Sequence, residues 1–430
     1  MLETLRNAWK VQDLRKKILF TFFIILIFRI GAVIPVPFID VAALKSSVSG
    51  AENQLFSYLS ILTGGGLEYG AIFAMSVTPY INSSIIMQLL AVAIPALERL
   101  SKEGEEGQKK IAQYTRYATI ILGLIQGTAY FFYLKGSGFL TVAGAGARWF
   151  AGFVIVLCLT AGSALVMWLG EQIDVKGIGN GISILLFAGI ISRAPQAAAG
   201  LWAWINMGTE GIIVAIVTVI VFLLIVAFIV WMTNAERRIP VMYAKRVVGN
   251  KMYGGQNSHI PIKVNMSGVM PIIFASSILM IPTMILSFMS DKTTSFAKIL
   301  NLFSVQGAFY AVLYFVMIIG FAYFYTTIQF NPVEMANNLR RNGGSVPGIR
   351  PGKPTSDFIQ KILSRITLMG ALFLSVIAIL PIFIGMIGDG RYSSISIGGT
   401  SVLILVGVAL DTVQNLESQM MMRHYKGFLD

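Results

Sequence analysis

The sequence predicts an all-α polytopic membrane protein with ten transmembrane helices. The 430-residue chain is 56% hydrophobic and only 12% charged, and its mean hydropathy is +0.74. Apolar stretches long enough to cross a hydrocarbon core of about 30 Å recur along the whole chain. Its formal net charge of +13 is concentrated in alternate connections between these stretches, which is typical of loops on the cytosolic side of a membrane.

Ten apolar segments account for the predicted spans, at about 18–37, 71–95, 117–135, 150–170, 178–193, 212–232, 267–288, 308–329, 366–386 and 397–416. Of the 33 Lys and Arg residues, 25 lie in one set of connections and seven in the other, with Arg29 inside the first span. The positive-inside rule therefore places both termini in the cytosol.

The stretch 53–95 departs from a simple span. The apolar run 56–63 ends at three glycines and is too short to cross the membrane. Segment 71–95 is long enough, but it is rich in polar side chains, namely Ser76, Thr78, Asn82, Ser83, Ser84 and Gln88. Because such side chains avoid lipid, we expect a re-entrant segment followed by a helix that faces protein or a water-filled cavity.

The midpoint of the chain falls between the fifth and sixth spans, which gives halves at 1–208 and 209–430. Two halves of five spans must have opposite orientations, as in an inverted repeat, although no internal sequence similarity supports a duplication. The second half contains two long basic loops, 233–266 and 330–365. Within the latter, turn-forming residues flank a short predicted helix around 333–340.

Catalytic and metal-binding motifs are not found in the sequence. It has no Walker-type phosphate loop, no HExxH and no GxSxG motif, and neither histidine has a partner at metal-ligand spacing. The single cysteine, Cys158, excludes a disulfide within the chain. The GIGNG run at 177–181 favours a tight helix start over a phosphate site. We therefore expect no enzyme activity, no metal and no cofactor.

Two features bear on transport through the membrane. Arg29 is the clear intramembrane charge, and we expect it to pair with backbone or a neighbouring helix, or to reach the interface. Ile81 and Ile85 lie one turn apart on one face of the second span, where branched apolar side chains can close a pore by dewetting. A position in lipid or in the protein core explains the same spacing, and periodicity alone favours that alternative.

Several longer motifs occur in order along the whole chain. They are FRIG (28–31) with IPVP (34–37), PYI (79–81) with SIIMQLL (84–90), QYTRY (113–117), WLGEQI (168–173), GIGNGIS (177–183), YAKR (243–246), KVNM (263–266), NP (331–332) with VPGIRPG (346–352), and GGTS (398–401). In this order and spacing they resemble the SecY/translocon alpha-subunit family of protein-conducting channels. The resemblance implies two inverted five-helix halves around a central pore, which is closed by an apolar ring and a short re-entrant plug helix.

The resemblance also assigns residues to these parts. The implied pore ring comprises Ile81, Ile85, Leu186, Ile190, Ile273 and Ile404. The implied plug, at about 55–66, includes Leu55, Phe56, Tyr58, Leu59, Ile61, Leu62, Gly64, Gly65 and Gly66. A lateral gate between the second and seventh spans would include Thr78, Asn82, Gln88 and Asn265, for which ordinary interhelical hydrogen bonding is an equal alternative.

The implied function is translocation of unfolded secretory polypeptides across the bacterial plasma (inner) membrane, with release of transmembrane segments into the bilayer. The implied partners are the small subunits SecE and SecG, the SecA ATPase, the ribosome with its RNA, and signal sequences and nascent polypeptides. Arg246 and Arg350 are the expected docking residues, because basic loops bind phosphate, although these charges also set topology. The main rival function is an ion-coupled secondary transporter with five-plus-five inverted repeats. An intramembrane protease is a third class, but the sequence shows no catalytic dyad or metal motif within its spans.

Overall fold

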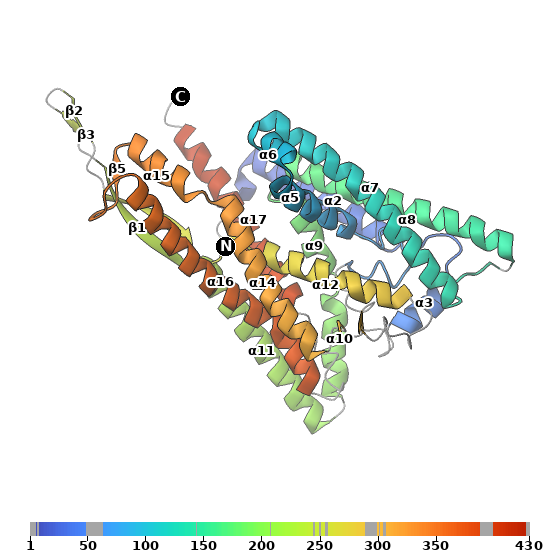
Figure 1. The fold of residues 1–430 in the computed structure, drawn as a ribbon. Helices are drawn as coiled ribbons and strands as arrows, with labels where there is room; N and C mark the ends of the chain where they lie inside the picture. The colour runs from blue at the N-terminus through green and yellow to red at the C-terminus, as the bar shows by residue number, and fades with distance from the viewer. Residues whose placement is uncertain are drawn as a thin grey trace. The chain divides into compact units, whose positions relative to one another are not determined.

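The computed structural model describes the chain except for residues 1–5, 7, 49–62, 143, 207, 244–245, 249–250, 254–256, 289–298, 301, 304–306, 388–398 and 427–430. The chain forms two compact units, which are described separately (Figure 1). The first unit comprises Met1–Ile216, Met280–Val305 and Ile404–Asp430, and the second comprises Val217–Leu279 and Gln306–Leu403. The division into halves at residue 208 stays a prediction.

The first unit is helical in its described residues. Its elements are α2 (Gln12–Gly31), α3 (Val41–Val48), α5 (Thr78–Ala93), α6 (Pro95–Lys102), α7 (Glu105–Gly136), α8 (Ala145–Lys176), α9 (Gly181–Ile191), α10 (Ala194–Ile205), the start of α11 (Thr209–Asn234), the end of α12 (Met270–Phe288) and most of α17 (Gly399–Lys426). The long helices α7 and α8 pack side by side along their lengths (Figure 1).

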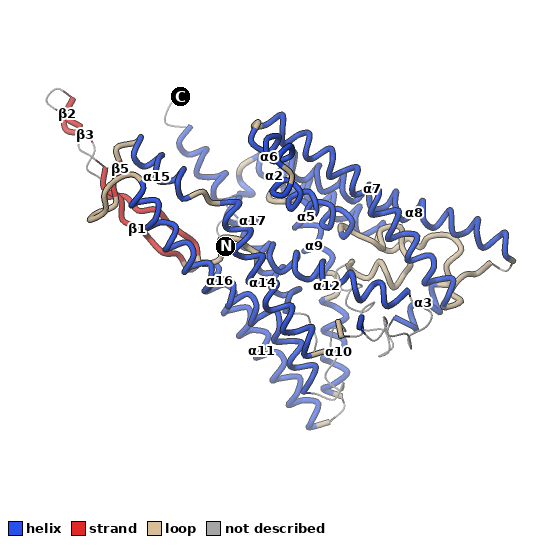
Figure 2. Tube along the Cα trace, viewed as in Figure 1, coloured by secondary structure: helices blue, strands red, loops and turns tan. Residues whose placement is uncertain are grey.

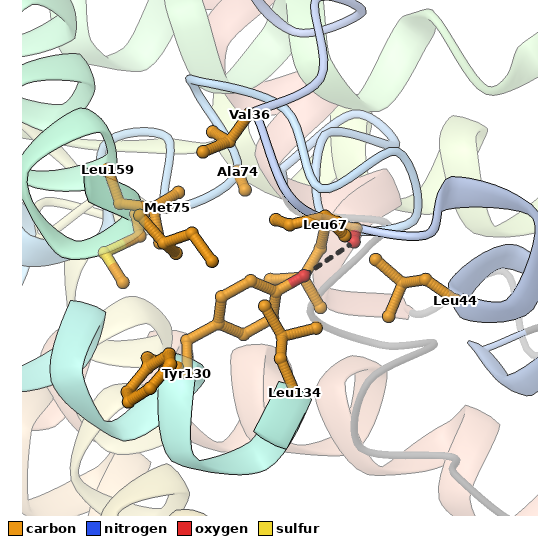
Figure 3. Packing of buried hydrophobic residues seen from close by; sticks show 11 residues of the cluster. Val36, Leu44, Leu67, Ala74, Met75, Tyr130, Leu134 and Leu159 are labelled. Atoms are coloured by element: carbon orange, nitrogen blue, oxygen red, sulfur yellow. Dashed lines mark hydrogen bonds between the residues drawn. The ribbon is translucent and has the colours of Figure 1, made fainter. Parts of the chain in front are cut away.

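The core of the first unit is built around a non-helical segment, residues 63–77, which we call the root segment. Leu67 and Met75 of this segment pack with Tyr130 and Leu134 of α7 and with Leu159 of α8 (Figure 3). The buried Tyr130 hydroxyl donates a hydrogen bond of 3.2 Å to the Leu67 carbonyl. Apolar burial and this bond together fix the segment against both long helices.

The second unit combines the rest of α11, α12 and α17 with α14 (Ala308–Gln329), α15 (Pro332–Arg341), α16 (Lys353–Ile387) and five strands. The strands are β1 (Glu236–Tyr243), β2 (Arg246–Val248), β3 (Lys251–Tyr253), β4 (Asn257–Lys263) and β5 (Gly344–Ser345). One antiparallel sheet has the order β4-β1-β5, and β2 pairs with β3 in a separate hairpin (Figure 2).

The sheet β4-β1-β5, helix α15 and the beginning of α16 share one apolar core, and we call this assembly the sheet platform. Ile239 and Val241 of β1 contribute to this core together with Leu339 of α15 and Ile359 of α16. Opposite them, Ile260 of β4 pairs with Ile239 across the sheet. Strands and helices from the two loops predicted at 233–266 and 330–365 therefore share one core.

The predicted class, a mostly helical multi-span membrane protein, is confirmed. Each of the ten predicted segments contains a helix. Seven helices in the described residues are long and apolar enough to span a membrane, or eight if the bent pair α5–α6 is counted as one span. The described stretch Met270–Leu279 of α12 is shorter, so the count of ten is not confirmed.

Three differences from the predicted elements bear on the site and the platform. The second span begins at Thr78 rather than at 71, because residues 71–77 form turns in the root segment, with Ser76 at φ +48°. The fifth span is longer than predicted, since α9 continues after a short break into α10, and together they cover Gly181–Ile205. The five strands in the two long loops were not anticipated, whereas the short helix predicted around 333–340 is present as α15.

Candidate functional site

Helix α9 carries two of the predicted ring residues, and its start is fixed by the GIGNG run. The Asn180 side chain caps the helix by accepting a hydrogen bond of 3.0 Å from the Ser183 amide. The Gly181 amide donates to Asp174 Oδ1 at 2.7 Å. A Cβ at Gly181 would lie 2.0 Å from the Gly170 carbonyl oxygen of α8. Only glycine permits this approach, which confirms that the run is a tight helix start.

The predicted ring residues lie on four helices. Leu186 and Ile190 are buried on α9, and Ile404 is buried on α17. On α5, Ile81 is half-buried and Ile85 is only 3% exposed, whereas the adjacent Ile86 is 43% exposed.

These five side chains belong to the first unit, and the half-buried Ile273 belongs to the second. The low exposure of Ile85 excludes the lipid-facing alternative for this residue. Whether it lies in the ring or in the core stays open, and membership of the ring stays a prediction.

Arg29 pairs with the backbone, which is one of the arrangements expected from the sequence. Its Nη1 donates a hydrogen bond of 2.9 Å to the Gly64 carbonyl oxygen in the root segment. The Ser192 hydroxyl, at the end of α9, lies 3.5 Å from the same oxygen. Gly64 has a φ of +65°, and a Cβ there would lie 2.8 Å from the Gly189 Cα. The start of the root segment is therefore held between α2 and α9.

An ion pair that the sequence analysis missed lies beside this contact. Arg193 Nη2 donates to Glu68 Oε1 at 2.5 Å, and the two side chains are only 19% and 10% exposed. In the sequence, Arg193 counts as a loop charge and Glu68 stands between a glycine run and a span. An acidic residue so close to a span was the available signal, but nothing local indicates its distant partner.

The described plug residues are the three glycines. Gly64, Gly65 and Gly66 form turns at the start of the root segment. The other predicted plug residues, Leu55, Phe56, Tyr58, Leu59, Ile61 and Leu62, lie outside the described residues.

The predicted gate residues are placed individually. Thr78 is the first residue of α5, and Gln88 Nε2 donates to Ser84 Oγ at 3.3 Å on the same helix. Asn82 of α5 and Asn265, between β4 and α12, each have a buried Oδ1 that accepts no hydrogen bond from the described residues. Buried amide oxygens in proteins usually have a donor, so both are candidates for a contact that forms in another state or complex.

The two predicted docking residues both lie in the second unit. Arg350 is exposed in the turn before α16, where its carbonyl accepts a hydrogen bond of 2.9 Å from Thr355. Arg246 begins strand β2 of the β2–β3 hairpin. In the sequence, the hairpin lies between β1 and β4 of the sheet platform.

A cavity of about 260 Å³ lies in the first unit between the start of α9 and the middle of α17, and it is lined by Asn180, Ser183, Val408, Asp411, Thr412, Gln414 and Asn415. Among the described residues, no group of three His, Cys, Asp or Glu side chains could hold a metal ion.

These features define a polytopic helical membrane protein. Its second span is rich in polar residues but also carries a buried isoleucine, and two of its loops contribute to a folded platform. Comparison with known proteins identifies the class further. A SecY family model matches residues 71–413, so the chain belongs to the SecY family. It is 44% identical to protein translocase subunit SecY of Streptomyces coelicolor over 449 aligned positions, which cover both chains completely. The same subunit of Mycobacterium tuberculosis is 41% identical over 445 positions, again with complete coverage.

Solved structures agree on the fold. The structure of a protein conducting channel matches with a TM-score of 0.67 and 18% identity, covering 94% of this chain and 92% of that chain. Sec61 in the canine ribosome-channel complex from the endoplasmic reticulum matches with a TM-score of 0.64 and 17% identity over the same shares. The family is thus one of protein translocase channels rather than of catalytic enzymes.

Proposed function

We propose that this chain is the channel subunit that conducts unfolded secretory polypeptides across the plasma membrane and releases transmembrane segments sideways into lipid. The observation that carries this proposal is the full-length similarity to translocase subunits at 41–44% identity. The charge asymmetry of the loops supports an orientation with both termini in the cytosol. The ion-coupled transporter is not favoured, because Arg29, the clear intramembrane charge, contacts a backbone carbonyl, and Glu68 is paired with Arg193.

The pore is closed by apolar side chains in this proposal. A ring of branched residues excludes water and ions by dewetting, yet it yields to a passing polypeptide without binding it specifically. The burial of Ile85, Leu186, Ile190 and Ile404 supports this assignment. The plug at 55–66 would add a second barrier, and its last residues, Gly64 to Gly66, are the start of the root segment.

In the proposed lateral gate, polar side chains of the second and seventh spans form hydrogen bonds that can break and form again; we call this contact the seam. The buried amide oxygens of Asn82 and Asn265 support such a seam, because they lack donors among the described residues. A hydrogen bond in a membrane is worth only about 0.6 kcal/mol on average. A seam of a few such bonds can therefore open when an apolar segment enters it.

The energy for transport would come from partners, because the sequence has no nucleotide-binding loop, and the chain itself would not be an enzyme. We propose SecA and the ribosome as these partners, with SecE and SecG as small membrane subunits. The sheet platform supports docking, because it is a folded body with its own apolar core and the exposed Arg350 lies in the turn before its helix α16. Arginines on a rigid surface suit the phosphates of ribosomal RNA.

Site-specific crosslinking tests the conduit directly. In a Cys158→Ala background, Ile85→Cys is compared with the matched control Ile86→Cys, whose side chain is 43% exposed rather than 3%. A secretory chain that carries one cysteine is arrested halfway through translocation. We expect a disulfide from position 85 to the arrested chain and none from position 86. Labelling of position 85 only by lipid-soluble reagents would refute a pore that is lined by α5.

A further inference from the structure

The root segment connects directly to a helix of the predicted pore ring. It ends at Val77, and α5 with Ile85 begins at Thr78. The segment is fixed to residues 31–36 by three backbone hydrogen bonds, from the amides of Val36, Ile72 and Phe73 to the carbonyls of Gly70, Ile34 and Gly31, at 2.9, 3.0 and 3.4 Å. Its apolar side chains are buried in the core of the first unit. A force on the root segment is therefore transmitted to α5 rather than absorbed in a flexible loop.

A second ring helix of the first unit, α9, is attached to this same segment. Arg193 follows the end of α9 by two residues and lies three residues after Ile190, which corresponds to about 4.5 Å along a helix. Its guanidinium contacts Glu68 at 2.5 Å. Ser192, the residue before it, is 3.5 Å from the Gly64 carbonyl that Arg29 also contacts. Because the Ser192 hydroxyl donates to the Gly189 carbonyl at 2.6 Å, the Arg193–Glu68 ion pair is the contact that attaches the end of α9 to the root segment.

The ion pair is a strong attachment. Charge-assisted hydrogen bonds of this length are about twice as strong as neutral ones. Both side chains are mostly buried, at 19% and 10% exposure, so solvent screens their attraction little. If the pair separates while it stays buried, two uncompensated charges remain, which is unfavourable. The pair therefore favours one spacing between α9 and the root segment.

We propose that Glu68 and Arg193 are positioning residues that fix the spacing between α5 and α9 and so hold the ring side chains of these two helices together. The proposal rests on the function proposed above, in which these helices line the pore. For the pore to widen between α5 and α9, the ion pair must separate. The pair then acts as a clamp on the ring, although neither residue belongs to the ring.

Ion conductance without substrate tests the clamp. The purified channel complex with the full chain is placed in planar bilayers as wild type, as Glu68→Gln, as Arg193→Gln and as the charge-swapped pair Glu68→Arg with Arg193→Glu. We expect each single variant to raise the open probability about tenfold, which corresponds to about 1.4 kcal/mol, and the swapped pair to restore most of the closure. Restoration by a swap is a result that loss of local structure would not produce.

A second ion pair of the same unit provides a matched control. Arg116 of α7 contacts Glu171 of α8 at 2.7 Å, but its side chains are 47% and 24% exposed, and the pair joins α7 to α8 rather than α9 to the root segment. We expect Glu171→Gln to conduct as wild type does. Wild-type conductance in both Glu68→Gln and Arg193→Gln, or a swapped pair that conducts as much as the single variants, would overturn the clamp.

A covalent clamp keeps the proposal testable if the glutamine variants fail to accumulate. In the Cys158→Ala background, Glu68→Cys and Arg193→Cys are joined by a cleavable bifunctional thiol reagent in membrane vesicles. We expect translocation of a secretory protein to stop on joining and to resume on cleavage, and unchanged translocation would overturn the clamp. If unmodified wild-type vesicles translocate no protein, the proposed function itself fails, so the two failures are distinguishable.

Discussion

The close crossing of α8 and α9 predicts a large effect for the substitution Gly181→Ala. The added Cβ would lie 2.0 Å from the Gly170 carbonyl oxygen and 2.9 Å from the Ile173 Cβ, whereas ordinary contacts begin at 3.4 Å. The start of α9 must therefore move away from α8 by about 1.4 Å, the difference between 3.4 and 2.0 Å. The obstacle is backbone, which cannot rotate away as a side chain can.

We expect this overpacking to cost about 1–3 kcal/mol of the free energy of unfolding. The displacement also lengthens the 2.7 Å hydrogen bond from the Gly181 amide to Asp174, which adds to the loss. The measurement is thermal unfolding of the detergent-purified chain, followed by tryptophan fluorescence, and we expect a lower melting temperature than for the wild type.

Gly146→Ala is the matched control, because Gly146 lies on α8 and its added Cβ would have no heavy atom within 4 Å. We expect that variant to stay within about 0.5 kcal/mol of the wild type. If Gly181→Ala has the same melting temperature as Gly146→Ala and the wild type, α8 and α9 do not cross as closely as the structure shows. The GIGNG run would then need another explanation.

Three further predictions concern the platform, the root segment and docking. Ile359→Ala removes a fully buried side chain from the platform core. We expect it to lower the free energy of unfolding by about 2–5 kcal/mol and to speed proteolysis within 233–266. The control Val376→Ala, on the exposed side of α16, should resemble the wild type. Tyr130→Phe removes the hydrogen bond to the root segment and should lower the free energy of unfolding by about 0.5–1.5 kcal/mol. Tyr117→Phe, at an exposed position of α7, is the control. An equal loss in both variants would show that the hydrogen bond from Tyr130 does not stabilise the fold. Arg350→Glu should weaken ribosome binding in a flotation assay and reduce its salt dependence, and unchanged binding at low salt would argue against docking at Arg350.

The sequence predicted those features that depend on local patterns. Long apolar runs identified ten segments that each contain a helix, because hydropathy is summed over many residues and needs no tertiary information. The Asn331-capped helix α15 was predicted within a loop for a similar reason, since its polar cap and flanking turn residues are local signals. The GIGNG run was interpreted as a helix start, and the Asn180 cap confirms this.

The features that the sequence did not reveal depend on contacts between distant residues. Residues 71–77 are apolar except for Ser76 and contain no glycine or proline, so they were assigned to the second span. A Cβ at Gly162 of α8 would lie 2.1 Å from the Ile72 carbonyl oxygen, and this close approach, invisible in the sequence, accompanies the non-helical path. Likewise, β1 pairs with β4 across the intervening hairpin, and Glu68 pairs with a residue 125 positions away.

The buried charges of the first unit are explained by the root segment. Backbone that leaves the helical form at membrane depth exposes carbonyl groups that a helix would satisfy, and each unsatisfied group is unfavourable in an apolar environment. Arg29 supplies the donor for one such carbonyl, that of Gly64, which offsets the roughly 2.5–3.5 kcal/mol that an arginine costs at the centre of a span. Glu68 lies in the same segment and is compensated by Arg193. The charges therefore occur where the backbone is irregular, and that irregular backbone in turn joins α5 and α9, two of the four helices that carry the proposed pore ring.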